Sequence, residues 1–348
     1  MYVGIRNALI RQAGDTRPLA DIYQDYFDRI VMAEQAGYDF IWFGEHHFMA
    51  NQWNPSPLLA LATVAGRTSH MRLGTSVLLT PFYNPLRLAE DVAQLDVQSH
   101  GRVDLVCGTA SITGEFETFG IQPAERFGRT FEAMAFVRRC FAEDRFDHHG
   151  RYYQIPNVRM TTQPVQQPFP IWFGGFGPKM LHRAGQEGYH LQTGGTDPQG
   201  PFGEYLAGLS QGGYEPADFN LATYARFVVV ATQSEVPAAR ERTLASEQAR
   251  REEYSPRGRD LAFQFRAGPT DLLASETNEH LVLGIPVGTP DQVLKALEPR
   301  WKSTRATHLE TGLGNPQTIT LVGREILPVL KSWGRSPVRE RANRPAAV

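Results

Sequence analysis

The chain has 348 residues, which is enough for one complete (β/α)₈ barrel or for two domains of average size. Hydrophobic residues make up 41% of it and charged residues 21%, an ordinary composition for a globular protein. The formal net charge is −2, so the chain has no basic field that would attract nucleic acid or an anionic membrane. The composition therefore favours a protein that acts on small molecules.

Cysteine usage and the N-terminal segment indicate the compartment. Cys107 and Cys140 are too few for a zinc cluster or a disulfide framework, which favours a reducing cytoplasm. The apolar stretch at residues 1–10 is interrupted by Arg11 and Asp15, so it predicts a first strand and not a signal peptide. No run of about 18 apolar residues occurs, so no membrane-spanning helix is expected.

Apolar patterns along the chain predict alternating strands and helices. Short apolar runs predict the strands, and stripes with a 3.6-residue period predict the helices between them. In the first two hundred residues, strands are expected at 2–9, 40–44, 73–79, 102–108, 171–174 and 190–193, and helices at 21–37, 57–68, 86–99, 124–141 and 179–188. Further on, strands at 223–231 and 306–311 alternate with helices at 236–248, 290–301 and 317–330.

This alternation recurs about eight times, and continuous apolar strands imply burial on both faces. An open doubly wound sheet shares these features, but the number of repeats and the chain length favour a (β/α)₈ TIM barrel. We expect a single barrel domain over 1–333, a flexible C-terminal tail over 334–348, and insertions in the βα-loops at 146–167 and 249–288. Each insertion is interpreted either as a lid or pocket wall, or as a solvated surface loop.

Two adjacent histidines follow the second predicted strand, in the segment Gly44–Phe48. Reactive residues of a (β/α)₈ barrel lie at the carboxyl ends of its strands, and neighbours on an extended chain point to opposite sides. One of His46 and His47 would therefore face the barrel mouth, where an imidazole can exchange a proton near neutral pH. The alternative is a surface or capping histidine. A metal site is disfavoured because the spacing is neither HxH nor HExxH.

A glycine-rich turn connects a predicted strand to a helix over residues 170–179. Backbone N–H groups at such a turn can bind an anion, and the helix dipole favours phosphate. Lys179 would add a positive charge in the first turn. The turn matches neither GxGxxG nor GxxxxGK[ST], and the alternative is a turn that needs glycine for its backbone angles.

Other candidates are less specific. Cys107 has no local base or cation to activate its thiol, so we interpret it as a core residue. Thr109, Ser111 and Thr113 could donate hydrogen bonds to a ligand, although loops often carry such residues without a function.

These segments together resemble the bacterial luciferase-like flavin-dependent monooxygenases. The resemblance covers most of residues 1–330. Its motifs are Ala33-Glu34, Gly37, Trp42, Gly44-Glu45-His46-His47-Phe48, Ser56-Pro57, Arg72-Leu73-Gly74-Thr75, residues 84–91, Leu95-Asp96, Ser99, Gly101-Arg102, Pro170-Ile171-Trp172, Gly174-Gly175 and Val287-Gly288-Thr289-Pro290.

The resemblance implies a homodimeric (β/α)₈ barrel that uses reduced FMN and O₂. The FMNH₂ would come from a separate flavin reductase, acting as a transient partner. A C4a-peroxyflavin would then oxidise a small, apolar or aromatic organic substrate. An aromatic pocket is consistent with the positions of Phe43, Phe48, Trp53, Phe82 and Tyr83 at or after the ends of strands two and three.

The resemblance also implies roles for individual residues. His46 matches the catalytic histidine beside the flavin, and Ser76 and Val77 match the pair joined by a non-prolyl cis peptide under the isoalloxazine ring. Gly175, Phe176 and Gly177 fall on the phosphate loop.

One position departs from the family pattern. Thr109 stands where many members carry an arginine that grips the flavin phosphate. Losing such a charge-assisted hydrogen bond costs about 1.5–3 kcal/mol, or about ten- to a hundredfold in affinity. Two alternatives therefore stay open: an F420-dependent dehydrogenase of the same fold, and a degenerate flavin-binding protein without catalysis.

Overall fold

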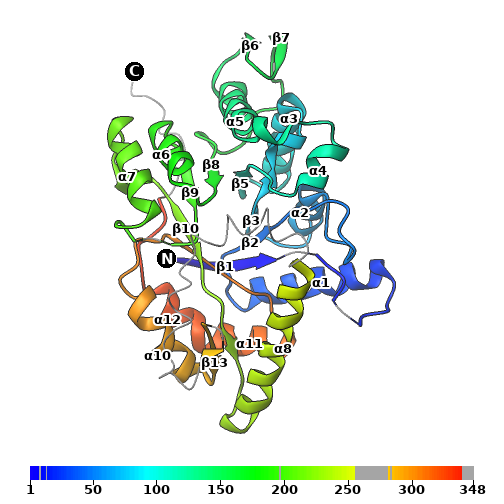
Figure 1. The fold of residues 1–348 in the computed structure, drawn as a ribbon, viewed down its shortest axis with the longest axis vertical. Helices are drawn as coiled ribbons and strands as arrows, with labels where there is room; N and C mark the ends of the chain where they lie inside the picture. Colours follow the sequence, from blue (N-terminus) through cyan, green and yellow to red (C-terminus); the bar gives the residue numbers. More distant parts are fainter. Residues whose placement is uncertain (8, 13, 196, 255–280, 283, 339–348) are drawn as a thin grey trace.

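The computed structural model describes residues 1–338 except 8, 13, 196, 255–280 and 283. Its centre is a closed barrel of eight parallel strands (Figure 1). In chain order these are β1 (Tyr2–Asn7), β2 (Phe40–Phe43), β3 (Arg72–Thr75), β5 (Val103–Gly108), β8 (Ile171–Gly174), β9 (His190–Gln192), β10 (Leu221–Tyr224) and β14 (His308–Thr311). The pairing of β1 with β14 and of β3 with β5 closes the ring. The predicted (β/α)₈ barrel is confirmed.

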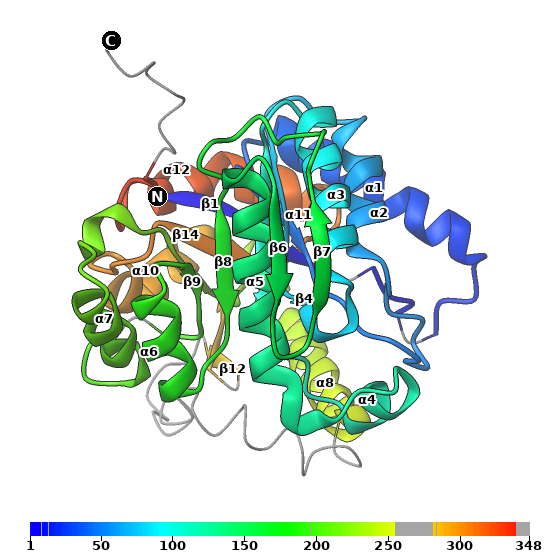
Figure 2. The same cartoon turned by 90° about the horizontal axis from the view of Figure 1, so that it is seen from above.

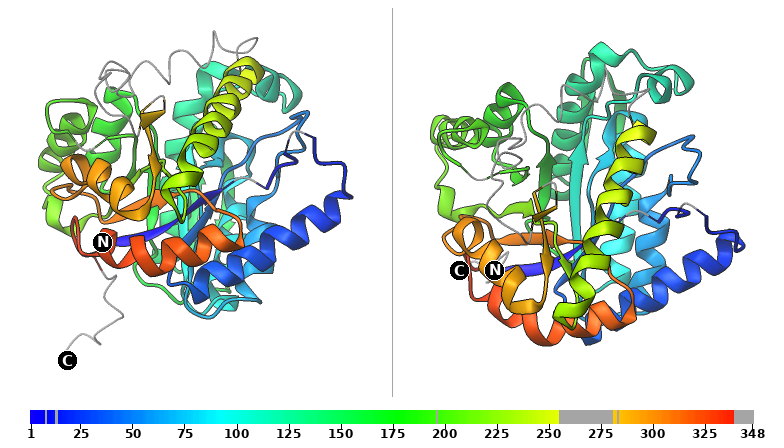
Figure 3. Two further views of the ribbon diagram at one scale, coloured as in Figure 1. Left: turned by 90° about the horizontal axis from the view of Figure 1, so that it is seen from below. Right: turned by 60° about the horizontal axis from the view of Figure 1, so that its bottom comes forward.

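Helices surround the barrel and cover the outer face of its strands (Figure 2). They include α1 (Leu19–Gln35), α2 (Pro57–Ala65), α3 (Pro85–Gln98), α5 (Arg126–Ala142), α6 (Pro178–Gln186), α7 (Pro201–Gln211) and α10 (Pro290–Trp301). The last helical segment runs as α11 (Pro316–Leu321), a π-helical turn over Val322–Ile326, and α12 (Leu327–Lys331); α11 lies beside α1 (Figure 3). No helix in the described part of the chain is both long and apolar enough to cross a membrane.

Side chains alternate between the two faces of each strand, as the period of a β-strand requires. On β1, for example, Val3 and Ile5 belong to the main core between the sheet and the helices. The opposite face points into the barrel, where Phe40, Trp42, Val106, Trp172 and Ala222 form a separate cluster.

The same alternation determines which residues point into the barrel at the carboxyl ends of the strands. We refer to this end of the barrel as the mouth. Its inward-facing residues are Arg6, Gly44, Ser76, Gly108, Gly174, Gln192, Tyr224 and Glu310. Glycine and serine at several of these positions leave the mouth lightly filled on one side.

Four segments differ from the sequence prediction. The strand expected at 73–79 is broken into β3 and β4 (Leu78–Leu79). The strand expected at 223–231 ends as β10 and resumes as β11 (Val228–Val229), which pairs with β13 (Ile285–Gly288) instead of joining the barrel. The short helix α4 (Thr113–Thr118) and the helix α7 were not predicted.

The two insertions are different in kind. Residues 146–167 contain an antiparallel hairpin of β6 (Phe146–His149) and β7 (Gln154–Val158), which runs along α5 (Figure 2). The helix predicted at 236–248 is α8 (Val236–Tyr254), which extends into the second insertion and lies beside β13, and β12 (Leu281–Val282) pairs with β13 (Figure 3). Other parts of the predicted insertion at 249–288 lie outside the described residues, namely 255–280 and 283.

The helices α6 and α7 pack so closely that glycine is required at their contact. A Cβ atom on Gly208 would overlap the backbone carbonyl oxygen of His182, and one on Gly185 would overlap that of Tyr205. Because these obstacles are backbone atoms, a side-chain rotation cannot remove the overlap.

We therefore expect Gly208→Ala to lower the free energy of unfolding by about 1–3 kcal/mol, as overpacking does in other cores. The matched control is Gly114→Ala in α4, where an added Cβ would meet nothing within 4 Å. Urea denaturation of both variants measures the difference. If the two variants have the same free energy of unfolding, α6 and α7 can move apart without loss of stability, which would contradict the prediction.

Candidate functional site

His46 lies just after β2 at the barrel mouth. Its Nδ1 is 3.1 Å from Oε1 of Glu115, which comes from α4. The indole of Trp53 meets the imidazole edge-on, with ring centroids 4.8 Å apart. The imidazole is therefore held on one edge and one face, and its orientation is defined before any ligand binds.

Glu115 was missed by the sequence reasoning, although it organises this part of the site. Its side chain is buried, and the same Oε1 accepts the backbone N–H of His47 at 2.8 Å. The second oxygen, Oε2, is buried without a hydrogen-bond partner among the described residues. With Glu115 Oε1 as the acceptor, Nδ1 of His46 is the donor, and Nε2 of a neutral imidazole then carries the lone pair.

His47 belongs to a separate network. Its Nε2 is 2.8 Å from Oε1 of Glu45, which also accepts the Tyr83 hydroxyl at 3.0 Å. The other Glu45 oxygen accepts the backbone N–H of Leu79 at 2.8 Å. Burial and the neighbouring Glu45 both raise the pKa of Tyr83 well above its ordinary value, so the phenol stays protonated and donates to Glu45. Glu45 thus ties the loop after β2 to the segment around β4.

The peptide bond between Ser76 and Val77 is cis, as the resemblance implies. It interrupts the third barrel strand between β3 and β4. The Val77 side chain lies directly against Gly108 and Gly174, where a Cβ atom would overlap its methyl groups. Gly44 approaches the Ser76 carbonyl oxygen in the same way, with its hypothetical Cβ at 3.3 Å. Val77 therefore fills the space beside the two glycines, and it also packs against the inner barrel cluster and against Leu79 and Phe116.

A buried polar cluster stands on the other side of Ser76. Gln192 Nε2 donates to Ser76 Oγ at 2.6 Å and to Glu310 Oε1 at 2.7 Å. The Ser76 hydroxyl donates to the other Glu310 oxygen over 3.4 Å. Glu310 is fully buried, and this burial raises the pKa of its carboxyl group. The sequence reasoning missed both Gln192 and Glu310.

The predicted phosphate loop joins β8 to α6. The N–H of Gly175 donates to the carbonyl of Gln192 at 3.1 Å, so this amide is engaged within the barrel and is not available to a ligand. The N–H groups of Phe176 and Gly177 meet no backbone acceptor among the described residues. Lys179, in the first turn of α6, is exposed and forms no ion pair within the described part of the chain.

Thr109 follows β5 and is partly buried. Its hydroxyl forms no hydrogen bond with another described residue. The next residue, Ala110, has a φ of 54°, so the chain turns sharply here toward α4. Thr109 is therefore available as a neutral donor at a position where the family pattern has a cation.

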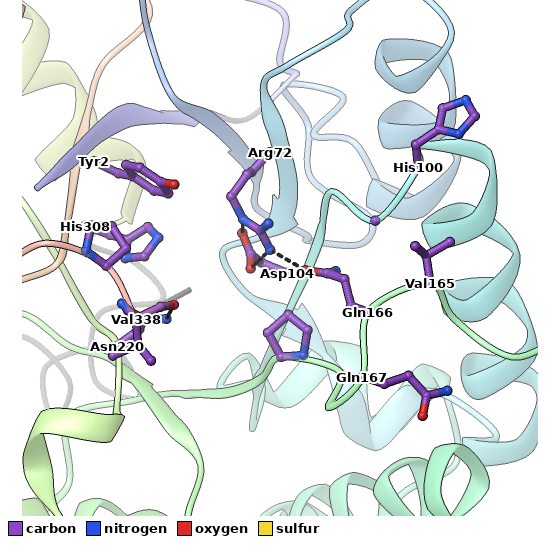
Figure 4. A pocket seen from close by; sticks show the side chains of 13 residues that line it. Tyr2, Arg72, His100, Asp104, Val165, Gln166, Gln167, Asn220, His308 and Val338 are labelled. Carbon is purple, nitrogen blue, oxygen red and sulfur yellow. Dashed lines mark hydrogen bonds and ion pairs between the residues drawn. The ribbon is translucent and has the colours of Figure 1, made fainter. Parts of the chain in front are cut away.

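A cavity lies at the opposite end of the barrel (Figure 4). It has a volume of about 350 Å³ and is lined by residues at the amino ends of strands, including Tyr2, Arg72 and Asp104. Arg72 binds Asp104 through two hydrogen bonds of 2.6 and 2.9 Å, and Gln166 accepts a third at 3.0 Å. Burial lowers the pKa of His308, at the edge of this cavity, to about 3. None of the predicted site residues lines it.

Comparisons with known proteins show the family of this chain. The model of a family described as luciferase-like monooxygenase matches residues 6–308. The oxygenase component of a flavin-dependent trigonelline monooxygenase from Acinetobacter baylyi is 30% identical over 187 residues, covering 53% of this chain and 52% of the relative. An F420-dependent glucose-6-phosphate dehydrogenase from Kineococcus radiotolerans is 34% identical over 172 residues, covering 46% and 49%. The chain spans about half the length of the curated relatives it matches.

A solved structure shows the same fold at low identity. The oxygenating constituent of 3,6-diketocamphane monooxygenase from Pseudomonas putida, in complex with FMN, superposes with a TM-score of 0.70 and 18% identity over 94% of this chain and 98% of that chain. This likeness concerns the fold alone. The family match covers far more than half of the sequence and includes the segments that form the barrel mouth, and the chain therefore belongs to the luciferase-like monooxygenase family.

Proposed function

We propose that this protein is the oxygenase component of a two-component flavin-dependent monooxygenase. It would receive reduced FMN from a separate reductase and oxidise a small organic substrate with O₂. The observation that carries the proposal is that an oriented histidine, His46, and the Ser76–Val77 cis peptide, with Val77 packed against Gly108 and Gly174, lie at the same end of the barrel. The relative from Acinetobacter baylyi, named as a flavin-dependent oxygenase component, supports it.

The residues at the mouth fit a flavin in two respects. A flat ring can approach Val77 because Gly108 and Gly174 carry no side chains there. The amides of Phe176 and Gly177, the start of α6 and the Lys179 ammonium together suit a phosphate group, to which the Thr109 hydroxyl would add a neutral hydrogen bond. Bound reduced FMN would supply the electrons that activate O₂.

The chain's own contribution is to hold and move a proton. Glu115 is a positioning residue: it fixes the Nδ1–H tautomer of His46 and leaves the Nε2 lone pair as a proton acceptor. A general base positioned in this way contributes about 10²–10⁴-fold to the rate of a proton-transfer step. Trp53 restricts rotation of the same imidazole.

An F420-dependent dehydrogenase is the second candidate, because relatives with that activity match the chain at similar identity. In that case His46 would assist hydride transfer between the deazaflavin and an alcohol.

Cofactor choice is tested by anaerobic titration with FMNH₂ and, separately, with reduced F420. We expect FMNH₂ to bind more tightly. After O₂ is admitted, we also expect oxidised FMN to appear more slowly in the protein than in a solution of free FMNH₂, and His46→Ala to change this rate. The matched control is His70→Ala, an exposed histidine outside the mouth. Tighter binding of F420, or oxidation as fast as that of free flavin, would contradict the monooxygenase proposal.

The role of Glu115 is tested by ¹⁵N NMR of the histidine side chains in the cofactor-free protein. We expect His46 to be the Nδ1–H tautomer in the wild type and in Glu115→Gln, because the amide oxygen still accepts a hydrogen bond. Glu115→Leu removes the acceptor and should shift His46 toward the commoner Nε2–H tautomer. An unchanged tautomer in Glu115→Leu would show that Glu115 does not position His46.

A further inference from the structure

Arg6 is a cation at the barrel mouth that the proposed cofactor site does not use. It occupies the inward-facing position near the end of β1, and its side chain remains 45% exposed. None of the other inward-facing residues named above for the barrel mouth is basic. Its guanidinium lies beside the ring of Tyr224, with Cζ 5.7 Å from the ring centroid.

The nearest carboxylate does not satisfy Arg6. Arg6 Nε is 3.8 Å from Oε2 of Glu310, which is too long for a hydrogen bond. Glu310 has its hydrogen bonds from Gln192 and Ser76 instead. Burial raises the pKa of Glu310, which reduces the negative charge available to neutralise the guanidinium. Apart from this long ion pair with Glu310 and the contact with the Tyr224 ring, Arg6 donates no hydrogen bond to any described residue, so its N–H groups can still bind a ligand.

We propose that Arg6 binds the carboxylate of the substrate, and that the substrates are small organic acids with an apolar or aromatic body. This rests on the proposed function, because it concerns the same barrel mouth. A guanidinium matches a carboxylate through two parallel hydrogen bonds. The substrate body would meet aromatic rings, since both Tyr224 and Phe176 lie against Gly194 at this side of the mouth.

The mouth thus has two separate positions for anions. The amides of Phe176 and Gly177 with Lys179 at the start of α6 suit a phosphate group. Arg6, on β1 beside β14, stands next to the Ser76–Glu310 cluster, where a substrate would meet the cofactor ring. The alternative is that Arg6 binds the phosphate of the cofactor. The experiment below distinguishes binding of a carboxylate from binding of this phosphate.

The test uses the cofactor-free protein, with benzoate as the anionic probe and benzamide as its neutral analogue. Isothermal titration measures both affinities in the wild type and in Arg6→Gln, Arg6→Lys and Lys179→Gln. We expect benzoate to bind the wild type more tightly than benzamide does. Arg6→Gln should lower the affinity for benzoate about tenfold or more without changing the affinity for benzamide. Arg6→Lys should retain part of the preference for benzoate over benzamide, and Lys179→Gln should leave the affinity for benzoate unchanged.

Two results would overturn the proposal. One is equal affinity of the wild type for benzoate and benzamide, and the other is loss of benzoate binding in Lys179→Gln but not in Arg6→Gln. Arg6→Lys keeps the charge, so it reports on the guanidinium even if Arg6→Gln is unstable. FMN titration of the same variants distinguishes this proposal from the proposed function. If benzoate binding depends on Arg6 but the protein binds no FMN, the carboxylate site is supported and the proposed use of FMN is contradicted.

Discussion

The contact of Val77 with two glycines determines the shape of the barrel mouth. The Val77 side chain occupies the space that side chains on Gly108 and Gly174 would fill, so one residue between β3 and β4 contacts both β5 and β8. A closed barrel packs its interior with side chains in layers, and most of this interior follows that rule with Trp42, Trp172 and their neighbours. Phe40 and Trp42 fill the space beside Gly4 and Gly74 inside the barrel, and Val77 does the same beside Gly108 and Gly174 at the carboxyl end. The flat ligand that we propose would lie against Val77 at this end.

Buried carboxylates organise the residues around the barrel mouth. Removing a carboxylate from water is costly unless hydrogen bonds replace the lost solvation, so each buried acid imposes an arrangement on its partners. Glu45 ties His47 and Tyr83 together, Glu115 orients His46, and Glu310 holds Gln192 and Ser76. The acids thus divide the mouth into a proton-transfer side near His46 and a polar side near Arg6.

Much of the barrel could be predicted from the sequence because parallel strands covered by helices have a regular apolar rhythm. His46 could be singled out because it follows a predicted strand, and the cis peptide at Ser76–Val77 followed from the family resemblance. Gln192 and Glu310 could not be found in this way. Strands buried on both faces lack polar alternation, so nothing in the sequence alone distinguishes the residues that face the lumen. Glu115 was missed because α4 has only six residues, too few for a helical period to appear.

Binding of a flavin ring against Val77 is the central claim, and NMR of protein labelled at the valine methyl groups and with ¹⁵N in the backbone, during titration with FMN, tests it most directly. The account predicts that FMN shifts the Val77 methyl signals and the Gly177 amide signal, whereas riboflavin, which lacks the phosphate, shifts Val77 alone. Signals of Val165 and Val338, which line the cavity at the opposite end of the barrel, should not move. Unchanged Val77 signals in a protein that has bound FMN would contradict the account.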